Sequence, residues 1–87
     1  MKFNSNKERS AYWVYLQETY TSVELEDALQ LLKPVIREIL LLHYREGLTF
    51  VETAAKLKRS VSIIRNHHNR GIYQLYRHFN PRFFETA

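Results

Sequence analysis

The chain has 87 residues, 45% of them hydrophobic, and a net charge of +4, which suits a single domain with one small core. The absence of cysteine excludes a disulfide framework, thiolate zinc sites and a thiol nucleophile. The sequence shows no signal-peptide apolar region and no apolar run near the roughly 20 residues that cross a membrane, so we expect a cytoplasmic protein without a membrane segment.

Helix signals begin near the start of the chain, while two glycines and two prolines are too few for a many-stranded sheet. Residues 7–20 are predicted to form a helix with a broad aromatic face, made of Tyr12, Trp13, Tyr15 and Leu16. The segment from Thr21 to Glu24 fits a capping box, in which the hydroxyl and the carboxylate satisfy backbone N–H groups. This box opens a second helix that runs to about Leu32 with one apolar stripe.

A third helix is predicted from Pro34, whose fixed φ suits a first helical turn, to a glycine C-cap at Gly47. Its apolar residues recur at helical spacing, and among them His43 is expected to be a satisfied core histidine. A second capping box at residues 49–52 opens a short helix that continues through about Leu57.

Ser60 is the predicted N-cap of the last helix, which ends near Phe79 because the residue before Pro81 avoids the helical region. A short capped helix, a short turn and a long basic helix form the helix-turn-helix layout, in which the second helix reads the major groove. Ala54 and Ala55 are small enough for the two helices to cross closely, and Lys58 stands where the turn glycine is usual. The prediction is an all-α bundle of four to five helices that contains a helix-turn-helix.

The last helix has one apolar and one polar face when successive residues are turned by about 100°. The apolar arc holds Val61, Ile64, His68, Gly71, Ile72, Leu75 and Phe79. The opposite arc holds Ser62, Asn66, Asn69, Arg70, Tyr73 and Arg77, with Arg65 on its flank. No carboxylate occurs between Glu52 and Glu85, and residues 47–87 carry seven Lys and Arg against two Asp and Glu. A basic face without acids favours contact with a polyanion, because phosphate would repel carboxylates.

Roles in DNA binding follow from the side-chain chemistry. Asn66 can bind adenine through two hydrogen bonds, and Ser62 can bind several base edges. Arg65 and Arg70 suit either guanine or phosphate, while Asn69 suits either phosphate or simple solvation. Phosphate contacts are expected from cations around the turn and from N–H groups at two helix starts, namely Lys56, Lys58, Arg59, Thr49 and Ser60.

Several segments of the sequence together carry a family resemblance. They read Leu29-x-x-Leu32-x-Pro34-x-x-Arg37-Glu38-Ile39-Leu40, Tyr44-x-Glu46-Gly47-Leu48-Thr49-Phe50-x-Glu52-x-Ala54, Leu57-x-x-Ser60-x-x-x-Ile64-Arg65, and Arg70-Gly71 followed by Leu75. Over about residues 22–78 they resemble region 4 of bacterial sigma-70-type RNA polymerase sigma factors, with the extracytoplasmic-function class the most similar. They are also similar to the LuxR-type helix-turn-helix, which stays open as an alternative.

The resemblance implies recognition of the upstream (−35) promoter element and docking on the flap of the RNA polymerase β subunit. It places base contacts at Val61, Ser62, Arg65 and Asn66. The chain departs from the family pattern at Gly71, where alanine is usual, at His68, a usually apolar position, and at Arg59, another usually apolar position. Region 2 of a sigma factor is absent, so we expect a stand-alone regulator built on region 4 or a domain of a longer protein.

The predicted organisation is a helical extension at residues 1–21, a DNA-binding domain at 22–80 and a tail at 81–87. The aromatic extension is expected mainly to pack as core, and Phe83 and Phe84 could dock on it or mediate a homodimer. We expect no enzyme and no cofactor, because the sequence shows no glycine-rich phosphate loop and no clustered acids outside the second helix. We expect no metal site, because His67 and His68 point about 100° apart on a helix; His67 instead suits the flank of the groove. The alternative is a protein-interaction module that binds RNA polymerase or a sigma regulator without reading bases.

Overall fold

The computed structural model describes residues 5–81, with side chains from residue 11 onward, and every regular element among them is a helix. The helices are α1 (Ser5–Thr19), α2 (Ser22–Gln30), α3 (Pro34–Tyr44), α4 (Phe50–Leu57) and α5 (Val61–Phe79). The predicted all-α bundle with a helix-turn-helix is confirmed. None of these helices is long and apolar enough to cross a membrane. Phe83 and Phe84, proposed to dock or dimerise, lie outside the described residues.

Side-chain caps fix where α2, α4 and α5 begin. The Thr21 Oγ1 accepts from the Glu24 N–H at 3.1 Å, and the Glu24 carboxylate accepts from the Thr21 N–H at 2.8 Å. Thr49 and Glu52 make the same two hydrogen bonds at the same distances, 3.1 and 2.8 Å. The Ser60 Oγ accepts from the N–H three residues further on, at 3.1 Å. Both predicted capping boxes and the predicted Ser60 cap are confirmed, and such a cap contributes about 1 kcal/mol.

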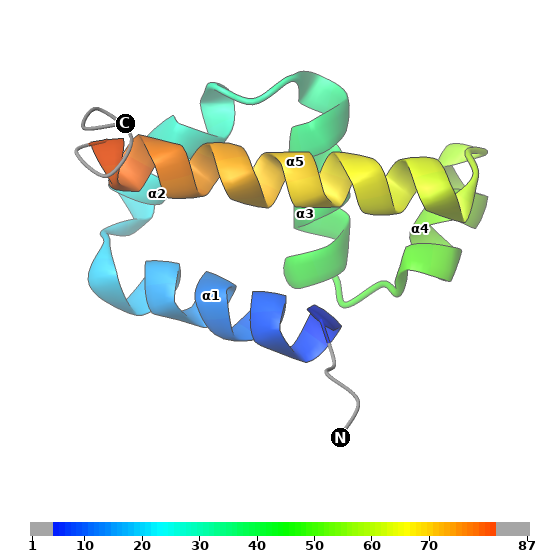
Figure 1. Ribbon diagram of the computed structural model, residues 1–87, viewed down its shortest axis with the longest axis horizontal. Coiled ribbons are helices and arrows are strands. Elements are labelled where there is room, and N and C mark those ends of the chain that lie inside the picture. The colour runs from blue at the N-terminus through cyan, green and yellow to red at the C-terminus, as the bar shows by residue number, and fades with distance from the viewer. Residues whose placement is uncertain (1–4, 82–87) are drawn as a thin grey trace.

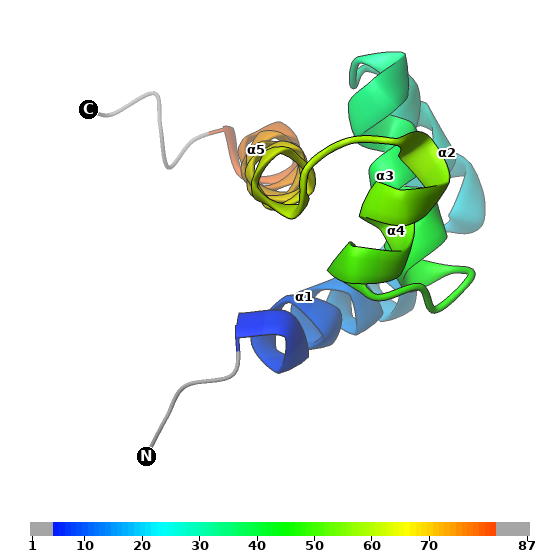
Figure 2. The same cartoon turned by 90° about the vertical axis from the view of Figure 1, so that its right-hand side faces the viewer.

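The longest helix, α5, lies across α3, with which it makes the most extensive contact of the bundle (Figure 1). Figure 2 looks nearly along α5 and shows α2, α3 and α4 gathered on one side of it, with α1 below. The opposite side of α5 is left uncovered by the described helices. The arrangement therefore gives α5 one packed face and one open face.

Two groups of buried apolar side chains form the core. The larger group joins α1, α2, α3 and α5 and consists of Trp13, Leu16, Leu25, Ala28, Leu29, Leu32, Ile36, Leu40 and Leu75. The smaller group joins α3, α4 and α5 and consists of Ile39, Phe50, Ala54 and Ile64. The inner arc predicted for α5 is confirmed, because Ile64, His68, Gly71 and Leu75 are all buried.

Helix α1 shares the larger core group with the helices that follow it. Trp13 and Leu16 are 3% and 0% exposed. The Trp13 ring stacks on the ring of Tyr44, the last residue of α3, with centroids 4.8 Å apart and planes 3° from parallel. The expectation that this aromatic face packs as core is confirmed for Trp13 and Leu16, whereas Tyr15 is 52% exposed.

Tyr12 lies partly buried on α1, and its hydroxyl has no hydrogen-bond partner among the described residues. Burial raises the pKa of Tyr12 from 10.0 to about 12, and the neighbouring hydroxyls of Tyr20, Tyr15 and Tyr76 add to the rise. The folded state therefore favours the neutral phenol. Ionisation of this group leaves the stability of the fold unchanged below about pH 10 and lowers it as the pH rises toward 12, because the phenol ionises more readily in the unfolded chain.

Tyr12→Phe is expected to retain the stability of the wild-type chain at neutral pH and to resist unfolding better between pH 10 and 12, because no phenol must ionise there. Far-UV circular dichroism across that range measures the effect. Tyr15→Phe is the matched control, since Tyr15 is 52% exposed on the same helix, and it should unfold with the wild-type chain. Identical alkaline transitions for wild type and Tyr12→Phe would contradict the assignment.

Helix α5 packs closely on α3 at Gly71. A Cβ atom added at this position would lie 2.7 Å from Ile36 Cγ2 and 3.0 Å from Leu40 Cδ1. Ile36 and Leu40 are 1% and 0% exposed, so neither side chain can move into solvent. The glycine that departs from the family pattern therefore lets two α3 side chains pack directly on the backbone of α5.

Gly71→Ala is expected to destabilise the fold by about 1 to 2 kcal/mol, because overpacking outweighs the gain of about 1 kcal/mol in helix propensity. Urea denaturation gives the free energy of unfolding. Gln74→Ala, at an exposed position of the same helix, is the control and should change stability by only a few tenths of a kcal/mol. An unchanged or raised stability for Gly71→Ala would contradict this prediction, because it would show that Ile36 and Leu40 can shift without cost.

Candidate DNA-binding surface

The turn between α4 and α5 is built on Lys58, the C-cap of α4. Its φ of 57° and ψ of 47° lie in the left-handed region, where glycine is usual. The Lys58 N–H reaches the carbonyls of Ala54 and Ala55, and the Arg59 N–H donates to the Ala54 carbonyl at 3.0 Å. The lysine thus adopts the glycine conformation itself, and the turn carries Lys58 and Arg59, both exposed, to the start of α5.

The crossing of α4 and α5 depends on one of the two predicted alanines. Ala54 is 5% exposed and packs in the smaller core group. Ala55 is exposed, so the prediction that it lies at the crossing is wrong. The buried side of α4 instead runs through Phe50, Thr53 and Ala54. Ala55 follows Ala54 by about 100° of rotation, which turns its side chain to solvent.

The outer face of α5 is polar, basic and exposed. All of the side chains predicted for it are exposed, namely Ser62, Arg65, Asn66, Asn69, Arg70, Tyr73 and Arg77. Lys56, Lys58, Arg59 and Ser60 are exposed beside the N-terminal end of the same helix. Residues 53–81 contain no Asp or Glu. The structure therefore gathers most of the predicted site residues on one convex, acid-free surface, the shape that a major groove admits.

Two predicted site residues, Thr49 and Val61, lie differently from the rest. The N–H and the hydroxyl of Thr49 are both used in its capping box with Glu52, so a phosphate at this position would have to displace a carboxylate. Val61 is half-buried and packs against the smaller core group. Both residues stay predicted contacts, with less surface to offer than the outer face of α5.

Arg65 makes a cation–π contact. Its guanidinium carbon lies 5.7 Å from the ring centroid of Phe50, the first residue of α4. Phe50 is only 6% exposed, so the ring itself is held by the core. A cation over an aromatic ring at an exposed site gains about 0.5 to 1 kcal/mol. This contact helps to hold Arg65 at the edge of the outer face.

A shallow hollow on one flank of α5 contains Ile63, an apolar residue that the sequence patterns do not single out. The hollow is lined by Arg59, Ile63, Asn66, His67 and Arg70. Ile63 is 42% exposed between polar side chains, and such a group suits contact with a thymine methyl. The sequence signal was its position, one residue before Ile64 and therefore about 100° away from the core.

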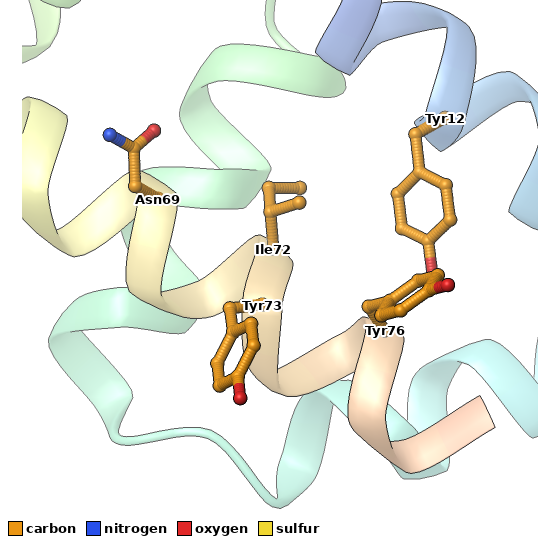
Figure 3. A pocket seen from close by; sticks show the side chains of 5 residues that line it. All are labelled: Tyr12, Asn69, Ile72, Tyr73 and Tyr76. Carbon is orange, nitrogen blue, oxygen red and sulfur yellow. The ribbon is translucent and has the colours of Figure 1, made fainter. Parts of the chain in front are cut away.

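A second hollow lies between α1 and the C-terminal half of α5. Tyr12, Asn69, Ile72, Tyr73 and Tyr76 line it. Figure 3 shows Tyr12 reaching from α1 toward Tyr76, while the amide of Asn69 points away from the tyrosines. Asn69 therefore belongs both to this hollow and to the outer face. Within the described part of the chain, no group of three or more His, Cys, Asp or Glu is placed to hold a metal ion.

An exposed basic helix behind a tight turn and a short capped helix defines the class of helix-turn-helix domains. The family model described as Sigma-70, region 4 matches residues 22–75, more than half of the chain, and the chain belongs to this family. Region 4 is a DNA-binding regulatory domain that in sigma factors binds −35 DNA and RNA polymerase. Comparisons with curated proteins and with solved structures found no match. The matched residues run from α2 into α5 and leave α1 outside.

Lys58→Gly is expected to raise the stability of the fold and to lower its affinity for DNA. Glycine adopts the left-handed conformation without steric cost, so the variant should gain about 1 kcal/mol of stability. It also removes a cation from the turn. If Lys58 contacts a phosphate, the slope of log affinity for duplex DNA against log salt concentration should become shallower by about one. Lys58→Ala is the control, because it removes the same charge without relieving the backbone. Equal stability of the two variants would contradict strain at Lys58.

Proposed function

We propose that this chain is a transcription regulator that binds promoter-type duplex DNA, with α5 as the recognition helix in the major groove. The observation that carries the proposal is the exposed outer face of α5, which presents amides, hydroxyls and cations and no carboxylate. Membership of the region 4 family supports it independently. The proposed site of action is the cytoplasm, where promoter DNA is found.

The length of α5 limits how much of it can read bases. Its 19 residues span about 28 Å at 1.5 Å per residue, whereas the major groove is about 12 Å wide. In a helix-turn-helix the N-terminal turns of the second helix enter the groove. We therefore assign base reading to Ser62, Arg65 and Asn66, and phosphate contacts to the cations of the turn, Lys56, Lys58 and Arg59.

We also propose that the chain docks on RNA polymerase through the flap of the β subunit, as the family relationship suggests. The surface available for such docking includes a hollow along α3, lined by Pro34, Arg37, Glu38, Leu41, Leu42 and Glu46. A domain that holds DNA with α5 and the polymerase with α3 would bring the enzyme to a chosen promoter.

The test begins with the full chain and a randomised duplex pool, from which bound sequences are recovered and compared. Fluorescence anisotropy then measures the affinity for the selected duplex and for a scrambled duplex of equal composition, from 50 to 200 mM salt. We expect a selected motif and a steep fall in affinity with salt, because cations replace counterions on the phosphates. Failure to bind either duplex even at low salt would overturn the proposal.

Asn66→Ala is expected to reduce the ratio of the two affinities by about 5- to 100-fold, the value of one two-bond base contact. Binding to the scrambled duplex should change little, since phosphate contacts are retained. Gln74→Ala, two turns further along α5, is the matched amide control. A ratio unchanged by Asn66→Ala would remove Asn66 from the reading end of the helix.

A further inference from the structure

His68 lies on the buried side of α5 and contacts Asn69 on the exposed side. The residue is fully buried, with its Nε2 atom 2.6 Å from the Tyr44 hydroxyl and its Nδ1 atom 3.2 Å from the Asn69 Oδ1. With the proton on Nδ1, the ring donates to the Asn69 oxygen and accepts from the Tyr44 hydroxyl. One neutral tautomer therefore makes both hydrogen bonds, and its position fixes the Asn69 carboxamide.

The Tyr44 hydroxyl is in turn held in place by α1. The Tyr44 ring lies parallel to Trp13 at 4.8 Å, and Trp13 is 3% exposed. His68 is also packed against the rings of Phe50 at 4.9 Å and His43 at 5.3 Å, so it has little freedom to turn. We call Trp13, Tyr44 and His68 the buried aromatic link. It runs from α1, outside the matched region 4 segment, to the buried side of α5, where His68 contacts Asn69 of the outer face.

We propose that the buried aromatic link orients Asn69 for DNA binding, which rests on the proposed function of α5. Because His68 holds the Asn69 oxygen, the two Nδ2–H groups are the donors that face outward. Asn69 then binds hydrogen-bond acceptors, either a phosphate oxygen or an acceptor on a base edge. It does not make the two-bond contact with adenine, which needs the amide oxygen as well. Tyr44 and His68 act as positioning residues.

A double-mutant cycle in the full chain tests this proposal. Tyr44→Phe keeps the ring that stacks on Trp13 and removes the hydroxyl that binds His68. Asn69→Ala removes the oriented amide. The two variants and their combination are titrated on the duplex selected by the wild-type chain and on its scrambled counterpart, at a temperature where circular dichroism shows all of them folded.

Asn69→Ala is expected to weaken binding about two- to tenfold, the value of one hydrogen bond. Tyr44→Phe should cause part of that loss in the wild-type background and none in the Asn69→Ala background, because it acts only through Asn69. A loss on both duplexes assigns a phosphate to Asn69, and a loss on the selected duplex alone assigns a base edge. Equal losses from Tyr44→Phe in both backgrounds, or no loss in either, would overturn the link.

Two further measurements test the role of His68 directly. Nitrogen-15 NMR of the imidazole should show the His68 proton on Nδ1 in the wild-type chain and a changed signal in Tyr44→Phe, a response that loss of packing alone does not require. Tyr12→Phe, which removes a buried hydroxyl that has no described partner on the same helix interface, should leave affinity unchanged. If Asn66→Ala weakens binding and Asn69→Ala does not, the proposed function stands and the link fails.

Discussion

The packing of Ile36 and Leu40 onto the backbone of α5 at Gly71 sets the rotation of this helix. Each residue of a helix turns by about 100°, so a shift of one position would bring Ile64 to the surface and move Asn66 toward the core. The glycine removes the one atom that would separate the two helices here, and the inner arc of α5 is buried as a result. The direction in which Ser62, Arg65 and Asn66 point is therefore decided by an apolar contact on the other side of the helix.

Features encoded by short spacings could be predicted from the sequence, and features that depend on distant residues could not. A capping box needs a hydroxyl and a carboxylate three residues apart, so Thr21 and Thr49 predicted where α2 and α4 begin. The exposed face of α5 followed from helical periodicity repeated over its 19 residues, and this periodicity also gave most of the candidate site. By contrast, α4 has only eight residues, too few to show that Ala55 would be exposed. The pairing of His68 with Tyr44 spans 24 residues, and no local pattern encodes it.

Acidic side chains stabilise helix starts and helix contacts in this fold, whereas the exposed face of α5 carries cations without acids. The carboxylates of Glu24 and Glu52 cap helices, and Glu26 forms an ion pair with Arg45 between α2 and the end of α3. These acids stabilise the fold away from the outer face of α5. Helix α5 itself contains no acid, so it forgoes the i,i+4 ion pairs that would each add about 0.2 to 0.5 kcal/mol to a surface helix. Its stability must therefore come from packing of the inner arc.

Helix α1 is the part of the fold that can offset these costs. A lysine in the left-handed conformation and a glycine inside α5 each cost about 1 kcal/mol, and both help to position α5. Burial of a side chain such as Trp13 or Leu16 contributes about 1.5 to 3 kcal/mol, a gain of the same order. The matched region 4 segment begins after these two residues. The aromatic extension therefore stabilises a helix-turn-helix whose turn and second helix are shaped by charge and close approach rather than by stability alone.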